Sequence, residues 1–144
     1  MLFGEYFHQC DQKYRMRIPS KLRSELGEGC YITKGNDGCL FVFTKEEVDN
    51  ILNNKIDQLP IFDQKVNRAL RVLFSSAYKV VEDNQGRFLL PQALREYAGI
   101  EKDVVFVGVG KRAELWSVDR WKTYIAQSDA DIDNVLEELG NYGI

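Results

Sequence analysis

The chain has 144 residues, of which 44% are hydrophobic, and its formal net charge at pH 7 is −3. This apolar content suffices for one domain core, or for two small units that share a core. No apolar run approaches the roughly 18 residues of a membrane span and no charged-then-apolar leader is present, so we expect a soluble, cytoplasmic protein with no membrane partner.

The first predicted elements are two strands joined by a polar turn. Leu2–His8 and Tyr14–Ile18 have strand character, and in the second strand Arg15 and Arg17 alternate with apolar residues, so both arginines should point outward. Asp11 begins the turn, because its short side chain can accept hydrogen bonds from the backbone amides that follow. Two strands joined in this way would form a β-ribbon, a shape that fits the major groove of DNA.

A short helix should follow the second strand. Pro19 ends the strand and suits the first helical turn, so the helix is predicted from about Ser20 to Leu26, with Gly27 just past its end. Lys21 would then lie on the solvent side of this helix. We call the segment from Asp11 to Lys21 the Asp11 arm.

Positive charge is concentrated in this part of the chain. The segment between Asp11 and Glu25 contains five bases and no acid, namely Lys13, Arg15, Arg17, Lys21 and Arg23. Residues 129–144, in contrast, hold five acidic side chains and no base, so the rest of the chain carries a net charge of +2. A basic arm on an otherwise acidic body is compatible with a DNA contact surface, especially if oligomerisation repeats the arm.

The middle of the chain predicts a hairpin and two longer helices. The strands Cys30–Lys34 and Cys39–Phe43 flank a Gly-Asn-Asp-Gly turn. Thr44 is a suitable N-cap for a helix that ends near Lys55, and a second helix should cover Asp63 to about Leu73. Val48, Ile51 and Leu52 form the apolar stripe of the first helix, whereas Val66, Ala69, Leu70 and Leu73 of the second are expected to face inward. Both helices are also candidates for subunit contacts, although stripes with this spacing more often belong to the core of their own chain.

The segment Asp11–Gly27 occurs twice. Shifted by 72 positions it returns as Asp83–Gly99, and the same residue occupies six of the seventeen places. These pairs are Asp11/Asp83, Arg15/Arg87, Pro19/Pro91, Leu22/Leu94, Arg23/Arg95 and Gly27/Gly99. An internal repeat of this kind predicts two copies of one small structural unit.

The second copy begins with a predicted strand at Ser75–Val81 and an Asn-Gln-Gly turn. In this turn Gly86 occupies the place that Tyr14 holds in the first copy. Glycine accepts a positive φ without strain, whereas Tyr14 must avoid that conformation or bear a cost of roughly 1 kcal/mol. Tyr14 is also a candidate to stack on a sugar or a base.

The remaining elements repeat the order of the first half. Strands are predicted at 104–107 and 113–116, and Ser117 matches Thr44 as the N-cap of a closing helix. Trp121, Tyr124 and Ile125 give that helix its apolar stripe. Asp131–Leu139 should add a short acidic helix.

The doubled motif carries a family resemblance. Its order of Asp, three residues, Arg, a hydrophobe, Pro and a short Leu/Arg helix resembles the swapped-hairpin, or looped-hinge, superfamily of AbrB-like bacterial transition-state regulators. Two copies, together with the segments MLFGEYFHQCD, GCLFVF, REYAG, VVFVGVG and ELWS in this order, resemble the MraZ family. Members of that family are transcriptional regulators encoded at the head of the bacterial division and cell-wall gene cluster. The resemblance extends to about Gln127.

The expected fold is α+β. Two tandem β-hairpin/helix repeats of about 45 residues cannot each bury a sheet alone, so they should form one interleaved small β-barrel of the swapped-hairpin type with flanking helices. We expect a first repeat at residues 1–55, a helical connector at 56–74, a second repeat at 75–128 and an acidic tail at 129–144.

The favoured function is sequence-specific recognition of double-stranded DNA through the Asp11–Arg15 turn. Arg15 could pair with a guanine edge, while Lys13, Arg17 and Lys21 neutralise phosphates. Because the second copy has fewer bases, Arg87 is a weaker candidate contact, and the second motif should mainly build the scaffold. The resemblance implies a homo-oligomer, a ring, that reads direct repeats in a promoter, and hence a nucleoid-associated protein.

Three alternatives remain open. Asp11 and Arg15, like Asp83 and Arg87, could simply brace their turns, with Gly86 shaping the second one. The chain could instead be an antitoxin-like or protein-interaction module whose acidic tail binds a basic partner. An enzyme is disfavoured, because the only histidine is His8 and no phosphate-cradling glycine loop or nucleophile–base motif is present, so no catalytic residue or small-molecule substrate is expected.

The chain has three cysteines, Cys10, Cys30 and Cys39. They form no Cys-x-x-Cys pair and should be reduced, so no metal and no cofactor are expected either.

Overall fold

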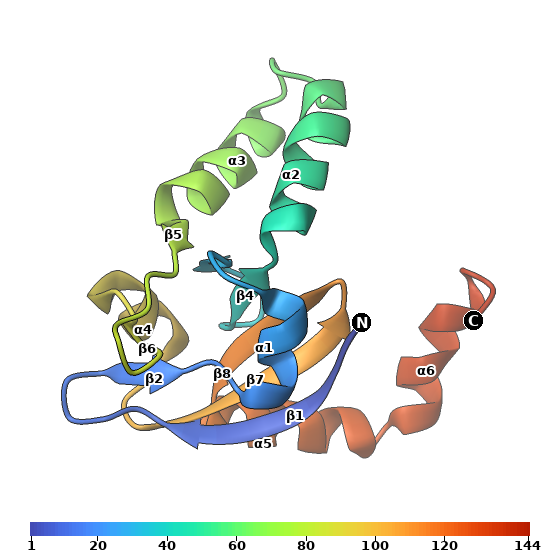
Figure 1. Cartoon of the computed structure of the whole chain (residues 1–144). Helices are drawn as coiled ribbons and strands as arrows, with labels where there is room; N and C mark the ends of the chain where they lie inside the picture. The colour runs from blue at the N-terminus through green and yellow to red at the C-terminus, as the bar shows by residue number, and fades with distance from the viewer.

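The computed structural model describes residues 1–144 and contains eight strands, six α-helices and one 3-10 turn (Figure 1). In chain order the elements are β1 (Leu2–Gln9), β2 (Arg15–Arg17), α1 (Ser20–Leu26), β3 (Tyr31–Lys34), β4 (Leu40–Phe43), α2 (Lys45–Asn54), η1 (Ile56–Gln58), α3 (Gln64–Ser76), β5 (Tyr78–Lys79), β6 (Arg87–Leu89), α4 (Gln92–Ala98), β7 (Asp103–Gly110), β8 (Arg112–Ser117), α5 (Val118–Asp129) and α6 (Ile132–Gly140). The predicted α+β class is confirmed.

The strands form two antiparallel sheets that both mix the two copies of the repeat. One sheet has six strands in the order β1-β7-β8-β4-β3-β5, and the other consists of β2 and β6. The two hairpins meet where β4 pairs with β8, from Leu40 opposite Leu115 to Phe43 opposite Arg112. The expected closed β-barrel is not observed, because β1 and β5 are the unpaired edges of the large sheet.

One core serves both copies. The two-stranded sheet places Met16 directly opposite Phe88, and both side chains are almost fully buried. Leu22 of α1 and Leu94 of α4 belong to the same cluster of 20 buried residues. The two repeats therefore share their hydrophobic core, as their small size predicts.

The expected β-ribbon between the first two strands is wrong. β1 pairs along its whole length with β7, from Leu2 opposite Gly110 to Gln9 opposite Asp103, whereas β2 pairs with β6 of the second copy. The physical reason is length, since an eight-residue strand finds a full set of hydrogen-bond partners in β7 and a three-residue strand could not supply them. The Asp11 turn thus connects two different sheets.

The local helix signals are realised. α1 and α4 each follow a proline and end at a glycine with positive φ, 66° at Gly27 and 65° at Gly99. The side chains of Thr44 and Ser117 accept hydrogen bonds from backbone N–H groups three residues ahead, which confirms both predicted N-caps. The predicted acidic helix near the C-terminus is also present as α6.

The two long helices of the first half are exposed, so the inward burial expected for the stripe of the second helix is not observed. Neither α2 nor α3 has a buried residue, although both carry the expected apolar stripes. The helices extend away from the sheet (Figure 1). No residue of either helix belongs to the buried clusters, and part of their stripes, with Val48 and Leu73, lines a groove between them. The predicted strand at Ser75–Val81 is also shorter than expected, because α3 continues to Ser76, whose hydroxyl bonds to Thr33, and only Tyr78–Lys79 remain as β5.

The cysteines are all free and buried. Burial raises the pKa of the Cys10 and Cys30 thiols to about 11 and that of Cys39 to about 12, so the thiols are protonated at neutral pH. None of the helices combines the length and the apolar content that crossing a membrane requires.

Candidate nucleic-acid interface

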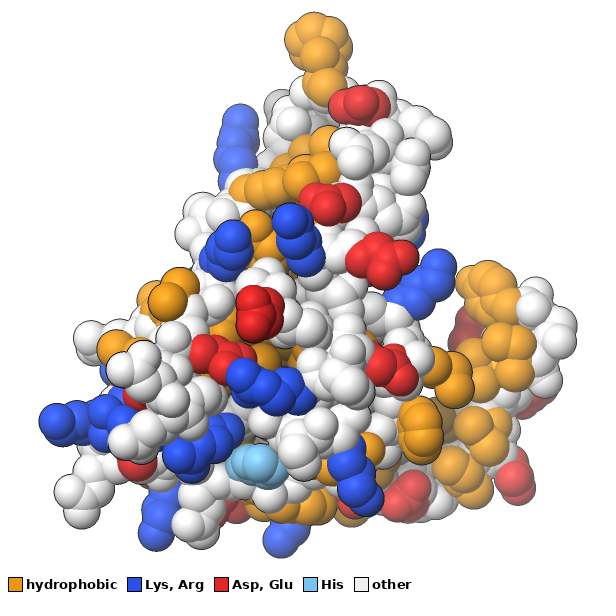
Figure 2. Space-filling view, viewed as in Figure 1, with side chains coloured by type: hydrophobic (Ala, Val, Ile, Leu, Met, Phe, Trp, Pro, Cys, Tyr) orange, Lys and Arg blue, Asp and Glu red, His pale blue; other side chains and the backbone are white.

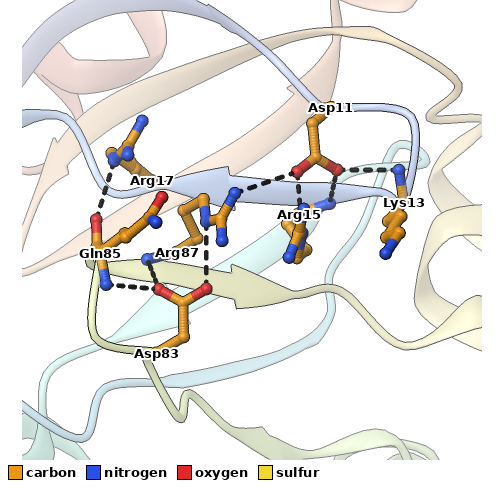
Figure 3. Close-up of polar contacts among 7 residues, drawn as sticks. All are labelled: Asp11, Lys13, Arg15, Arg17, Asp83, Gln85 and Arg87. Carbon is orange, nitrogen blue, oxygen red and sulfur yellow. Dashed lines mark hydrogen bonds and ion pairs between the residues drawn. The ribbon is translucent and has the colours of Figure 1, made fainter.

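The two repeated motifs fold into the same braced turn. Asp11 Oδ1 accepts hydrogen bonds from the backbone N–H groups of Lys13 (2.8 Å) and Arg15 (2.9 Å), while Oδ2 accepts one from Arg15 Nε at 2.8 Å (Figure 3). In the second copy Asp83 accepts the equivalent bonds from Gln85 N, Arg87 N and Arg87 Nε at 2.8, 3.0 and 3.0 Å. The bracing role considered for these Asp–Arg pairs is therefore present in both copies.

The braces hold both aspartates in the charged form. For Asp11 the backbone N–H of Arg15 is the largest cause of a lowered pKa, and the Arg15 side chain adds to it. For Asp83 the backbone N–H of Arg87 lowers the pKa in the same way. Hydrogen bonds that are donated to a carboxylate stabilise its ionised state, so each turn depends on its carboxylate being deprotonated.

Contacts across β2 and β6 join the two turns. Arg87 Nη1 lies 3.8 Å from Asp11 Oδ2, so Arg87 faces a carboxylate from each copy (Figure 3). Arg17 Nε donates a hydrogen bond to the carbonyl oxygen of Gln85 at 3.0 Å. Arg87 is thus turned toward the interior of the paired motifs, whereas Arg17 remains exposed beside them.

The place held by Tyr14 and Gly86 takes the same backbone conformation in both copies. Their φ angles are 60° and 74°, so Tyr14 adopts the left-handed conformation that favours glycine. The guanidinium carbon of Arg95 lies 3.7 Å from the centroid of the Tyr14 ring. A cation–π contact between the two copies therefore covers one face of this ring and offsets part of the strain.

The roles of Arg95 and of its repeat partner Arg23 were not predicted from the sequence. Arg23 lies beside Gly86, the counterpart of Tyr14, and forms an ion pair with Glu82. Each arginine thus reaches across to the turn of the other copy. The sequence did show that Arg23 and Arg95 form one of the six identical pairs of the repeat. It did not show which residues these two arginines contact.

The remaining cations of the Asp11 arm point outward. Lys13, Arg17 and Lys21 are exposed, and Arg15 is partly exposed beside its brace. Lys13 lies in the turn, Arg17 at the end of β2 and Lys21 in the first turn of α1, and no acidic residue lies between them in the sequence. Figure 2 shows Lys and Arg side chains gathered over the end of the molecule where Figure 1 places β2 and the turn before it. Such a surface can bind phosphates, and no group of three or more His, Cys, Asp or Glu side chains is placed to hold a metal ion.

Comparison with known proteins agrees with this two-copy architecture. The model of the family described as "MraZ protein, putative antitoxin-like" matches residues 1–72 and again residues 73–140, once over each repeat. The chain belongs to the MraZ family. Proteins named transcriptional regulator MraZ from Clostridium botulinum (strain Alaska E43 / Type E3), Acetivibrio thermocellus and Alkaliphilus oremlandii are 47%, 44% and 40% identical to it. Each of these alignments covers 100% of both chains.

Membership of the MraZ family confirms the resemblance that the doubled motif carries. The two matched segments meet between residues 72 and 73, and the internal repeat has a shift of 72 positions. The MraZ relatives are named for transcriptional regulation. The contacts of the Asp11 arm with a ligand remain a prediction.

Proposed function

We propose that this chain is a sequence-specific DNA-binding transcriptional regulator of the division and cell-wall gene cluster, acting at the nucleoid. It reads direct repeats in a promoter through the Asp11–Arg15 turn, presented several times by a homo-oligomer. The observation that carries the proposal is the set of exposed cations, Lys13 in a turn that internal hydrogen bonds brace, and Arg17 and Lys21 in the strand and helix that follow it. The names of the relatives support the same class of function.

The three exposed cations are suited to phosphates. A Lys or Arg that neutralises a phosphate releases a condensed counterion, so affinity falls steeply with salt. Such contacts fix the position of a protein on the duplex but carry no sequence information themselves. We assign Lys13, Arg17 and Lys21 to this role.

Arg15 and Tyr14 are the candidates for contacts with bases or sugars. Arg15 uses Nε for its brace, which leaves the two terminal nitrogens of the guanidinium as donors for a guanine edge. Tyr14 is 40% exposed, and the face of its ring away from Arg95 could stack on a sugar or base. Arg87 faces two carboxylates, so we assign it to the scaffold together with Asp11, Asp83 and Gly86.

A comparison of two variants separates bracing from DNA recognition by Arg15. Asp11→Asn keeps an oxygen for the backbone N–H groups of Lys13 and Arg15 but removes the charge that holds the Arg15 side chain. If Arg15 contacts DNA, Arg15→Ala lowers affinity about 5- to 150-fold more than Asp11→Asn, since a bidentate pair with guanine contributes about 1–3 kcal/mol. Equal affinities of the two variants would assign Arg15 to the brace alone.

Footprinting on the DNA upstream of the chain's own gene, across a salt series, tests the proposal as a whole. We expect protection at evenly spaced short repeats, which disappears progressively as salt rises. Protection that does not change with salt concentration would contradict the proposal. So would protection that persists in the variant Lys13→Ala/Arg15→Ala.

The second candidate function is an antitoxin-like or protein-interaction module without direct DNA recognition. The family description includes the word antitoxin-like, and the acidic α6 is exposed at every residue. This alternative predicts that removal of residues 129–144 abolishes binding of a basic partner protein. The DNA proposal predicts that the same truncation strengthens nonspecific DNA binding, because it removes five acidic side chains that repel phosphate.

A further inference from the structure

Helix α3 presents a face of unpaired positive charge. Lys65, Arg68 and Arg71 recur at every third residue, all three are exposed, and none of them takes part in an ion pair of the chain. α3 is also the one helix of ten or more residues that has bases and no acid, since α2 and α5 carry both signs. We call Lys65, Arg68 and Arg71 the α3 cation face. Free cations gathered on one surface of a chain with a net charge of −3 indicate an anionic partner.

The α3 cation face points away from α2. Leu73 and Phe74 line the groove between the two helices, and at about 100° per residue the three cations fall on the opposite side of α3. The acids of α2 are Glu46, Glu47 and Asp49, and none of them pairs with a cation of α3. Glu47 instead lies 3.8 Å from Lys55. The charge of the face is therefore not neutralised by the neighbouring helix.

The side chains around these cations are mostly polar. The same helical period places Gln64 and Ser75 on this face, with Val72 as its one apolar member. The nearest acid in the sequence, Asp63, caps the helix, and its Oδ1 accepts hydrogen bonds from two backbone N–H groups of the first turn. The face thus lacks the aromatic or apolar centre typical of a protein interface, and it suits a row of phosphates.

The α3 cation face lies on the same side of the molecule as the Asp11 arm. Figure 2 shows Lys and Arg side chains both over α3 and over the end that carries β2. Lys79 of β5 is exposed between them, because its Cε lies 3.2 Å from the place where a Cβ on Gly29, just past α1, would stand. Two acids accompany this path, namely Glu28 and Glu82, and Glu82 is ion-paired with Arg23. One anionic ligand of sufficient length can therefore meet both basic surfaces.

We propose that the α3 cation face binds the phosphate backbone of the duplex that the Asp11 arm engages, at positions flanking the repeat that the arm reads. Lys65 and Arg71 are about 9 Å apart along the helix axis, and phosphates of one strand follow every 3.4 Å or so along the axis of DNA, so the face reaches about three of them. Such contacts add affinity that depends on salt but not on sequence. The inference rests on the proposed function, because it needs a duplex held by the Asp11 arm.

Two duplexes of different length test the inference. Both are made from the DNA upstream of the chain's own gene; one is trimmed to the repeats that footprinting protects, and the other continues for one helical turn, about 10 base pairs, on each side. Lys65→Ala/Arg68→Ala/Arg71→Ala removes the face and keeps good helix formers in α3. On the longer duplex this variant should show a slope of log affinity against log salt that is smaller by about 3 for each face engaged. Between about 50 and 200 mM salt, the wild type should then lose about 40-fold more affinity than the variant. On the trimmed duplex the two proteins should agree.

A charge-preserving variant is the matched control. Lys65→Arg/Arg68→Lys/Arg71→Lys keeps three cations at the same positions and should bind both duplexes as the wild type does, because a phosphate contact requires charge rather than one particular side chain. Equal slopes of the wild type and the alanine variant on the longer duplex would overturn the inference, and an acidic protein as the true partner of the face would give that result. So would an equal loss of affinity on the trimmed duplex, or a charge-preserving variant that behaves like the alanine variant.

The arm variant Lys13→Ala/Arg17→Ala/Lys21→Ala separates this inference from the proposed function. If the proposed function holds, the arm variant loses affinity for both duplexes. An arm variant with wild-type affinity would contradict the proposed function and, with it, the inference. A weakened arm variant beside an α3 alanine variant with the wild-type slope on the longer duplex would overturn the inference alone.

Discussion

The contact between Arg95 and Tyr14 leads to a prediction in which two opposing effects set the sign. Tyr14→Gly removes the strain of a tyrosine at φ 60°, worth about 1–2 kcal/mol. It also removes a cation–π contact of about 0.5–1 kcal/mol and gives the unfolded chain the extra freedom of glycine, a further cost of about 0.5–1 kcal/mol. These effects nearly cancel, so the free energy of unfolding should change by less than about 1 kcal/mol.

The cancellation should fail when Arg95 is absent. Arg95→Ala alone removes the ring contact and the hydrogen bond from its Nε to the carbonyl oxygen of Leu90, at a cost of about 1–2 kcal/mol. In that background Tyr14→Gly only relieves strain and adds glycine entropy, so it should become more favourable by about 1 kcal/mol than in the wild type. For a chain of this size the coupling corresponds to a shift of about 2–4 °C in Tm.

A double-mutant cycle measured by urea unfolding checks this value. Arg23→Ala provides the matched control, because Arg23 lies beside Gly86 and its effect should add to that of Tyr14→Gly. A coupling between Tyr14 and Arg95 below about 0.3 kcal/mol, within the range of independent sites, would refute the claim that the two copies are joined here by a cation–π contact.

Three further predictions concern the shared core, a close approach of strands and the braced turns. Phe88→Ala should destabilise the fold by about 3–5 kcal/mol in urea unfolding, since its side chain is only 1% exposed; a change below about 1 kcal/mol would contradict the packing. Gly108→Ala should cost at least about 1–3 kcal/mol, because its Cβ would overlap the backbone nitrogen of Phe3 across β1 and β7, and an unchanged Tm would be incompatible with this pairing. The pKa values of Asp11 and Asp83 lie below the ordinary 3.8, so the two carboxylates stabilise the fold above about pH 4. This contribution is lost as the pH falls through the lower pKa values of the folded state. Asp11→Asn/Asp83→Asn should therefore make the free energy of unfolding fall less steeply between about pH 6 and 2 than in the wild type.

The features that the sequence predicted correctly are local ones. Pro19 and Gly27 bound α1 because each acts on its own backbone, and Thr44 caps α2 through an amide three residues away. The bracing of the turn by Asp11 and Arg15, one of the alternatives left open by the sequence, likewise spans only five residues. Interactions of this kind depend on neighbours in the chain, so the order of residues is enough to identify them.

The features that were missed depend on contacts between distant segments. The sequence patterns of β1 and β2 identify them as strands, but they do not determine which strands these two pair with. The structure pairs β1 with β7 and β2 with β6. The stripes of α2 and α3 have the spacing of core helices, yet spacing does not reveal whether another element reaches them. Apart from its place among the identical pairs, nothing in the sequence distinguishes Arg95 from other charged helix residues. Arg95 contacts Tyr14 only because α4 of the second copy packs beside the turn of the first copy.

The salt dependence of DNA affinity tests the central claim most directly. Lys13→Ala/Arg17→Ala/Lys21→Ala removes three exposed cations of the Asp11 arm. Lys111→Ala is the control, because Lys111 is exposed and follows the end of β7 that lies away from the Asp11 turn. For each arm engaged, the triple variant should lower the slope of log affinity against log salt by about 3, roughly 1 for each phosphate that is no longer neutralised, while Lys111→Ala leaves the slope unchanged. Equal slopes for the wild type and the triple variant would show that the Asp11 arm does not bind the phosphates of DNA.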